Sequence, residues 1–312
     1  MKQLIEIPKF TVTIITYNQE KLIGRALDSI LAQKEWLYEI VVCDDCSSDN
    51  NWNIILDYYK KHPDLIRPFR NETNLGIYGN IERTWKEAKG ELILEMAGDD
   101  TIENGLFERV YNLIKTKKID YKNKAISIFC DFQIKYPNGL RRRGPSNKLL
   151  LNKKLNPISL KIRSLISNRT SFKSMPLIRN LKPAPRDAGH FCDELVDIQT
   201  VLYSEETYYF KFIGSTYYAH VGVSVNSDKK EYCKSMDLTR DKLKEIIDFS
   251  KKEDYYYEFL HQKRIFIYLD HSFKQLYLTT KYYFKSIELK YGIRGLNITR
   301  LLLDFRLLIK NL

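Results

Sequence analysis

The sequence contains no uninterrupted apolar run of the roughly 18–20 residues that a bilayer-spanning helix requires. Residues 1–9 mix charged and apolar side chains and lack the charged-then-apolar order of a secretory signal. The chain has five cysteines, and this odd number favours a reducing compartment over a framework of disulfides. From these observations we expect a protein that is made and kept in the cytoplasm.

Two glycine-rich motifs that bind phosphates in other α/β proteins are also missing. A dinucleotide-dependent oxidoreductase needs Gly-x-Gly-x-x-Gly after its first strand, and a sugar-nucleotide pyrophosphorylase needs a glycine-rich loop there. The first apolar run of this chain is followed by Thr16-Tyr17-Asn18-Gln19-Glu20 instead. Cys43-Asp44-Asp45-Cys46 has the spacing of half a zinc site, but no second pair completes it. These three classes of protein are therefore not expected.

Charge is divided unevenly along the chain. Residues 1–110 carry 13 Lys and Arg against 19 Asp and Glu, whereas residues 111–312 carry 38 against 20. The acidic part suits a domain that gathers carboxylates around a cation, and the basic part suits an anionic partner. A nucleic-acid binder would explain only the basic part, since the acidic loops repel phosphate, so we expect no nucleic acid as a partner. Arg141-Arg142-Arg143 follow the turn signal Pro137-Asn138-Gly139 and are expected in an exposed loop, where an acceptor phosphate or a lipid headgroup is an alternative to plain solvation.

Four segments of the acidic part share one pattern, in which an apolar run or a helix meets a polar loop. Strand, loop and helix in repeated order predict parallel strands with crossover helices, and ligands of such sheets lie beyond the carboxyl ends of the strands. Several acidic loops that converge there need a positive centre, so a divalent metal ion is expected. The segments are residues 10–15 with the loop Thr16 to Glu20, residues 39–43 with Asp44-Asp45-Cys46-Ser47-Ser48-Asp49, the loop Asn74-Leu75-Gly76-Ile77-Tyr78-Gly79-Asn80 ahead of a helix, and residues 92–97 with Gly98-Asp99-Asp100.

In order and spacing these segments resemble the family-two glycosyltransferases over roughly the first hundred residues. The resemblance implies an α/β, Rossmann-like GT-A fold with a central, mostly parallel sheet flanked by helices. The C-terminal helical region is predicted from the sequence pattern itself, which gives helix-like runs over 240–262, 263–285 and 296–310. It implies that Asp44 or Asp45 meets the base and ribose of a nucleotide sugar, and that Asp99 and Asp100 hold Mn²⁺ or Mg²⁺ against its diphosphate. The other residues that it places at the nucleotide sugar are Thr16, Tyr17, Asn18, Glu20, Ser47, Asn74, Gly76, Asn80 and Gly98.

One position departs from the family pattern. The metal motif of the family is usually acid–any–acid, and the first acidic place is taken here by Ala97. Magnesium can bind through one carboxylate together with substrate phosphates and water. We therefore expect weak metal binding without nucleotide.

The basic part carries a second set of candidate residues. His190 to about Tyr203 reads as a helix, followed by a strand over 208–213 and by the segment 217–224. In the resembling family an acid at the start of such a helix is the catalytic base, which makes Asp193 the first candidate, Glu194 the second and Asp197 the third. The alternative is helix capping, because acids in a first turn are favoured by the helix dipole. A Tyr-x-x-His-like segment further on implies that His220 closes over the metal or the diphosphate, although a histidine is often only structural.

The reaction implied by the resemblance is displacement at an anomeric carbon, with inversion of configuration. A general base takes the proton of an acceptor hydroxyl while the nucleoside diphosphate leaves. The expected donor is a UDP-sugar. The expected acceptor is a glycan or a lipid-linked glycan of cell-surface polysaccharide, lipopolysaccharide or glycoprotein synthesis. The alternative is a noncatalytic protein that binds nucleic acid or membrane with a degenerate nucleotide-sugar domain.

The sequence predicts two regions. Residues 1–225 form the transferase domain, with 1–110 binding the nucleotide sugar and 111–225 on the acceptor side, and residues 226–312 form a helical region. Within that region, residues 296–310 are strongly apolar with interspersed cations. Such a segment can lie on the anionic inner face of a membrane, or it can pack against the catalytic domain or against a second copy in a homodimer. From Lys148 to Arg186 the prolines predict short helices and loops.

Overall fold

The computed structural model describes residues 6–143, 170–182, 196–197, 199–200, 203–219, 221, 238, 241 and 277–281. The chain divides into two compact units, the first made of Met1–Arg186 with Val196–Val225 and the second of Asp187–Leu195 with Asn226–Leu312. All the strands and named helices belong to the first unit. Of the helices predicted beyond residue 240, residues 241 and 277–281 are among the described residues, and they are helical. No helix in the described part is long and apolar enough to cross a membrane.

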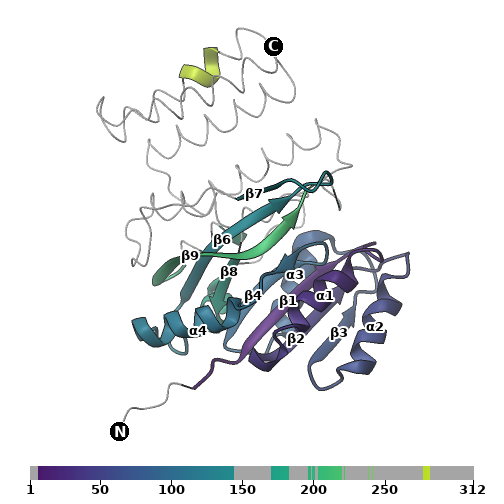
Figure 1. Cartoon of the computed structure of the whole chain (residues 1–312), viewed down its shortest axis with the longest axis horizontal. Helices are drawn as coiled ribbons and strands as arrows, with labels where there is room; N and C mark the ends of the chain where they lie inside the picture. The colour runs from purple at the N-terminus through teal and green to yellow at the C-terminus, as the bar shows by residue number, and fades with distance from the viewer. Residues whose placement is uncertain are drawn as a thin grey trace. The chain divides into compact units, whose positions relative to one another are not determined.

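A parallel half of the sheet is built from the N-terminal strands, in the order β3-β2-β1-β4. Strand β1 is buried along almost its whole length, as expected of a strand with helices on both faces. Helix α3 packs on β1 and β2, α2 packs on β2 and β3, and α1 packs against α2 (Figure 1). The elements are β1 (Phe10–Thr16), α1 (Ile23–Leu31), η1 (Lys34–Trp36), β2 (Leu37–Asp44), α2 (Asn51–Lys61), β3 (Ile66–Arg70), α3 (Gly76–Glu87) and β4 (Leu92–Ala97).

The same sheet continues beyond β4 in mixed orientation, in the order β4-β8-β6-β9-β5, with β7 paired to β6. Strand β8 is antiparallel to both of its neighbours, whereas β6 and β9 are parallel to each other. The expected GT-A type of α/β fold is confirmed. The predicted parallel strands make up the N-terminal half of the sheet. The elements are β5 (Thr101–Ile102), α4 (Leu106–Lys117), β6 (Ile126–Lys135), β7 (Arg141–Arg143), β8 (Thr170–Ser174), α6 (Met175–Asn180) and β9 (Glu206–Tyr218).

The connection from β4 to β5 forces this sheet to curl. The two strands are consecutive in the chain, yet β8, β6 and β9 lie between them in the sheet. Four strand-to-strand steps in a flat sheet would separate them by about 19 Å. The chain from Ala97 to Thr101 can span only about 14 Å even when fully extended. The sheet must therefore bend until its last strand approaches the carboxyl end of β4, and the residues that close this bend are Gly98, Asp99 and Asp100.

Three local expectations are corrected by the structure. Arg141–Arg143 form strand β7 and not a loop, because β6 extends far enough to pair with them. The strand expected over 208–213 and the start of the segment after it form one strand, β9. Thr170–Ser174 lie in a region read as helices and loops, but they form the fully buried strand β8.

Candidate functional site

The loop after β1 is fixed by short polar contacts at the carboxyl end of the sheet. The buried Thr16 hydroxyl donates to Gln19 Oε1 at 2.8 Å and lies 3.2 Å from Asn51 Oδ1 on α2. The Thr16 carbonyl accepts the Asp45 N–H at 2.9 Å. This threonine therefore joins the loops that follow β1 and β2.

Asn18 and Glu20 hold the same loop against the acidic loop after β2. Asn18 has a positive φ of 51°, which asparagine tolerates better than most residues. Its N–H donates to Ser47 Oγ at 2.9 Å, and its side-chain oxygen accepts from the Ser48 N–H at 2.8 Å. The Glu20 N–H donates to Asp49 Oδ2 at 2.9 Å. The two loops thus form one connected surface.

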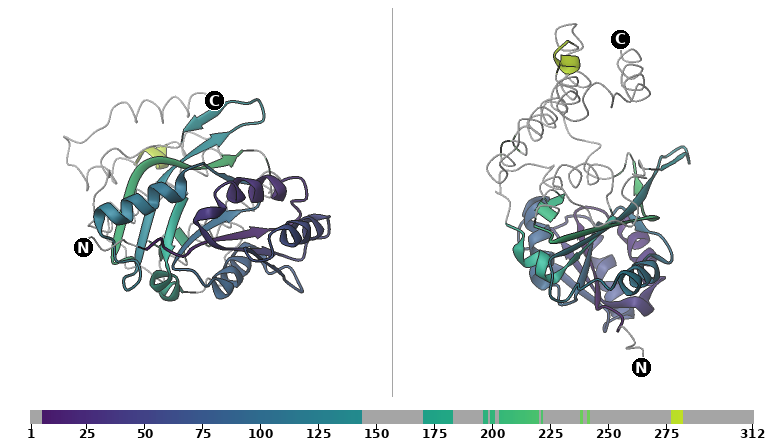
Figure 2. Two further views of the ribbon diagram at one scale, coloured as in Figure 1. Left: turned by 60° about the horizontal axis from the view of Figure 1, so that its bottom comes forward. Right: turned by 90° about the vertical axis from the view of Figure 1, so that its left-hand side faces the viewer.

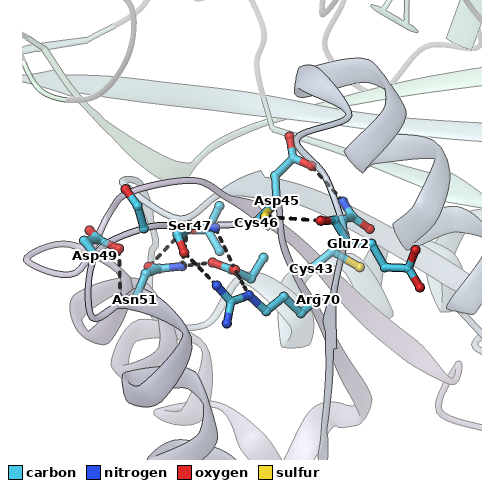
Figure 3. A network of polar contacts seen from close by, with 12 residues as sticks. Cys43, Asp45, Cys46, Ser47, Asp49, Asn51, Arg70 and Glu72 are labelled. Atoms are coloured by element: carbon cyan, nitrogen blue, oxygen red, sulfur yellow. Dashed lines mark hydrogen bonds and ion pairs between the residues drawn. The ribbon is translucent and has the colours of Figure 1, made fainter.

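Asp44 is the buried centre of a polar network at the end of β2, and Figure 3 labels three other members of this network, Ser47, Asn51 and Arg70. Its side chain has no exposed surface, and its carboxylate accepts from Asn51 Nδ2 at 2.6 Å and from the Ser47 N–H at 3.0 Å. Arg70 Nε lies 3.3 Å from Asp44 Oδ2, and Arg70 Nη2 donates to the Ser47 carbonyl at 2.7 Å. A buried carboxylate needs such partners to remain charged. Asp44 therefore sets the shape of the loop, and its contact with a base or ribose stays a prediction.

Asp45 connects the end of β2 with the start of α3. One carboxylate oxygen accepts from Asn71 Nδ2 and from the Leu75 N–H, both at 2.8 Å, and the other accepts from the Gly76 N–H at 3.0 Å. The Leu75 and Gly76 N–H groups lie at the start of α3, where backbone N–H groups have no partner inside the helix. An acid is favoured at this end by the helix dipole. Asp45 thereby fixes the glycine-punctuated loop.

Asn74, Gly76 and Asn80 each form a hydrogen bond in or next to that loop. Asn74 Oδ1 accepts from the Gly76 N–H at 2.9 Å, and Gly76 has a φ of 75° that favours glycine. Asn80 is buried and donates to the Cys43 carbonyl at 3.0 Å. Asn80 therefore ties α3 to strand β2 and lies beneath the loop.

The acid turn, Gly98-Asp99-Asp100, follows β4 directly. A Cβ atom at Gly98 would lie 2.6 Å from Gln19 Oε1 and 2.9 Å from Thr16 Oγ1, so only glycine lets the turn approach the β1 loop this closely. Burial raises the pKa of the Asp99 carboxyl, although its hydrogen bonds and the charge of Arg25 oppose this effect. Arg25 donates from Nη2 to the Asp99 carbonyl at 2.6 Å. The turn is thus packed against α1 and the β1 loop.

Asp100 faces the other side of the turn, where strand β9 ends. Its Oδ1 accepts the Tyr218 N–H at 3.2 Å. A recess of about 40 Å³ lies beside it, large enough for a few water molecules or one hydroxyl group. The polar part of the recess lining comes from β4, β5, β8 and β9 and comprises Glu95, Asp100, Thr101, Thr170, Ser215 and Tyr217.

The acid turn offers hard oxygen ligands of the kind that Mg²⁺ and Mn²⁺ prefer. Within the described ranges, no three histidine, cysteine or carboxylate side chains come together as a metal cluster. The residues fit a metal that takes one or two protein carboxylates and completes its coordination with phosphate oxygens and water. Such an ion would also relieve the cost of burying the charge of Asp99.

Other predicted site residues stand apart from this network. Tyr17 is 37% exposed at the tip of the β1 loop, so it is accessible to a ligand. Asp193, Glu194 and His220 lie outside the described residues. Asp197 is helical and partly buried, as expected of a residue in the predicted helix.

Four site residues were missed by the sequence reasoning. Asn51 and Arg70 hold Asp44, Asn71 holds Asp45, and Gln19 contacts Thr16. A signal existed for Arg70, because it ends the strand next to β2 and is the register partner of Asp44. Asn51 begins the helix that follows the acidic loop, and such positions commonly carry loop-fixing polar residues.

Four of the sequence relatives each align with between 29% and 41% of the chain. A poly(ribitol-phosphate) beta-glucosyltransferase of Bacillus spizizenii is 36% identical over 115 residues, which are 36% of this chain and 18% of that protein. The poly(ribitol-phosphate) beta-N-acetylglucosaminyltransferase TarS of Staphylococcus aureus is 37% identical over 97 residues, 30% of this chain and 17% of that protein. The aligned stretches span 26% and 46% of the length of two further relatives, so the chain covers less than half of the curated relatives it matches.

Solved structures share the fold at low sequence identity. TarS 1–349 of S. aureus in complex with UDP-GlcNAc aligns with a TM-score of 0.60 at 19% identity, covering 90% of this chain and 81% of that one. The mannosyltransferase PcManGT from Pyrobaculum calidifontis, in complex with GDP-Man and Mn²⁺, aligns at 0.57 and 14% identity, covering 97% and 80%. The model of glycosyl transferase family 2 matches residues 11–172, just over half of the sequence, and the chain belongs to that family.

Proposed function

We propose that the protein transfers a sugar from a UDP-sugar to a hydroxyl of a glycan or lipid-linked acceptor, with inversion at the anomeric carbon. The observation that carries this proposal is the acid turn, which is packed between the loop after β1 and the end of β9. A UDP-sugar donor is supported by two of the solved neighbours, which are complexes with UDP-GlcNAc and UDP.

In this proposal the loops after β1 and β2 form the wall for the nucleoside. Asp44 and Asp45 are held inside the protein by their partners, so they keep the loops in place without having to reorganise on binding. Tyr17 is accessible at the rim and offers a ring and a hydroxyl to the base or ribose. A preorganised wall of this kind lowers the entropy lost when the donor binds.

Asp99 and Asp100 would hold a Mn²⁺ or Mg²⁺ ion at the diphosphate, where the bound ion supplies positive charge as the nucleoside diphosphate leaves. Asp100 is oriented by the Tyr218 N–H, and Asp99 by contacts with α1 and Gln19. Because Ala97 replaces the usual first acid, the metal is bound tightly only together with the donor. Mn²⁺ in the PcManGT complex gives this proposal a precedent within the same fold.

The remaining parts of the proposal concern the acceptor side. Asp193, or else Glu194, takes the proton of the acceptor hydroxyl, and His220 closes over the diphosphate. The odd number of cysteines and the net charge of +12 support a cytoplasmic enzyme that contacts the anionic inner face of a membrane. Cell-surface polymers are the acceptor class, because two relatives act on poly(ribitol-phosphate) by their names.

The test is calorimetric titration of the full chain with UDP, GDP and uridine, each with Mn²⁺ or with EDTA. We expect UDP to bind, and Mn²⁺ to strengthen its binding at least tenfold. Asp100→Asn should remove the metal effect, whereas Asp57→Asn should not, because Asp57 is an exposed carboxylate on α2 paired only with Lys60. Failure of the wild-type protein to bind any nucleotide, with or without metal, would overturn the proposed function.

A further inference from the structure

A row of cationic side chains crosses the sheet beside the acid turn. Arg141 of β7 pairs with Lys135 of β6, and Lys135 pairs with Tyr218 of β9. Residues directly opposite on neighbouring strands project from the same face of a sheet, about 5 Å apart. Arg141, Lys135 and Tyr218 therefore form one line across β7, β6 and β9, and in Figure 2 the β6–β7 hairpin extends past the parallel half of the sheet.

A third cation joins this line at its inner end. The Arg25 guanidinium of α1 lies 3.5 Å from the centroid of the Tyr218 ring, and Lys135 Nζ lies 5.3 Å from the same centroid. Both charges are thus within about 10 Å of each other, which is the Debye length at 0.1 M salt. The Tyr218 N–H binds Asp100, so the row ends at the acid turn.

In the described part of the chain the cations of this row form no ion pair with a carboxylate, although the charge of Arg25 acts on the nearby Asp99. Among the described residues, no ion pair involves Arg25, Lys135 or Arg141. The Arg25 Nε is buried and has no hydrogen-bond partner in the described part of the chain. Like charges directly opposite on neighbouring strands destabilise a sheet, as Lys135 and Arg141 do here. An arrangement that places Arg25 and Lys135 at one ring, with Arg141 opposite Lys135 on the next strand, costs stability unless an anion is shared between them.

We propose that Arg25 and Lys135 at the Tyr218 ring, together with Arg141 opposite Lys135, form a binding site for phosphate groups of an anionic acceptor polymer. The inference rests on the proposed function, since it gives the acceptor of that reaction a chemical class. Guanidinium groups bind phosphate oxygens in a two-pronged geometry, and the lysine adds a mobile point charge. The row leads from the projecting hairpin to Asp100, so a polymer lying along it presents a hydroxyl to the donor site.

Two ligands can supply phosphate groups to this site. One is the acceptor polymer, and the other is the donor, whose diphosphate is proposed to bind near the acid turn. The acceptor is favoured by the extent of the row, which reaches across three strands to an exposed Arg141. A single diphosphate at the acid turn would need only Arg25. The test must therefore measure the two ligands separately.

The experiment compares binding of four ligands to the full chain: a short polyol-phosphate oligomer, a neutral dextran of similar length, UDP and anionic phosphatidylglycerol vesicles. The variants are Lys135→Met and Arg141→Met, and Arg25 is left in place because it also donates to the Asp99 carbonyl at the donor site. The matched control is Arg109→Met, which removes an exposed guanidinium that lies 4.5 Å from the Phe212 ring on another part of the sheet. Melting temperatures confirm that each variant is folded. Loss of one charged hydrogen bond is expected to weaken oligomer binding about tenfold or more.

Each outcome has a defined meaning. Weaker binding of the oligomer, with dextran and UDP unchanged, supports the acceptor site. Weaker binding of UDP alone would assign the phosphate site to the donor and overturn the proposed acceptor site. Unchanged binding of both, or a loss confined to anionic phosphatidylglycerol vesicles, overturns the inference. A wild-type protein that binds the oligomer but never UDP would count against the proposed function and not against this site.

Discussion

Replacement of Asp45 by alanine tests whether this carboxylate holds the site together. The side chain is 3% exposed and accepts three hydrogen bonds, from Asn71, Leu75 and Gly76. Each hydrogen bond to a charged group contributes about 1.5–3 kcal/mol, and water entering the space of the lost side chain recovers part of this. We expect Asp45→Ala to lower the free energy of unfolding by about 3 kcal/mol. Asp45→Asn, which keeps one acceptor oxygen, should lower it by about half as much.

The assay is urea denaturation followed by circular dichroism. With a typical urea dependence of about 2–3 kcal/mol per molar, the midpoint of Asp45→Ala should fall by about 1 M. The control is Asp57→Ala on α2, whose exposed partner is Lys60, and its midpoint should equal that of the wild type. The reasoning is refuted if Asp45→Ala and Asp57→Ala have the same midpoint, because Asp45 would then contribute nothing to the attachment of α3.

Three further predictions concern the acid turn, the thiols and the alkaline limit. Gly98→Ala should cost about 1–3 kcal/mol, since its Cβ would lie 3.0 Å from Thr16 Cβ, and a normal urea midpoint would contradict the packing. Burial raises the pKa of Cys43 to about 12, so iodoacetamide at pH 8 should label Cys46 and leave Cys43 intact until urea is added, as read by peptide mass spectrometry. Burial also raises the pKa of Tyr58 to about 12, so its contribution to stability is complete below pH 10 and is lost as the pH rises through 12; a phenylalanine there should make the melting temperature less sensitive to pH in that window.

The parallel half of the fold follows from the sequence because its strands are uniformly apolar and each runs into a polar loop. Strands β1, β2 and β4 were predicted on that basis, and their carboxyl ends meet as expected. The pairing of Asp45 with the start of α3 could not be predicted, because it depends on how the loop from Asn71 to Gly76 folds back. Sequence patterns thus locate the site, whereas tertiary contacts decide which carboxylates face inward.

Strand β8 illustrates the opposite case. Its sequence, Thr-Ser-Phe-Lys-Ser, has one large apolar residue and no alternation, yet every side chain is buried. Lys173 is 1% exposed and is paired with Glu95 on the neighbouring strand. A lysine is buried only when such a partner exists, and the partner lies far away in the sequence. Composition alone therefore pointed to loops.

Closure of the sheet determines when, during synthesis and folding, the acid turn can form. Thr101 of β5 pairs with Thr216 of β9, and Asp100 receives its hydrogen bond from Tyr218. Contacts so distant in sequence form late in folding, since a long loop must close first. A nascent chain can therefore pair β1, β2 and β4 early, but it cannot orient Asp100 until residue 218 has been synthesised. The end of β9, which orients Asp100, is synthesised only after most of the chain exists. Incomplete chains therefore cannot form the finished acid turn.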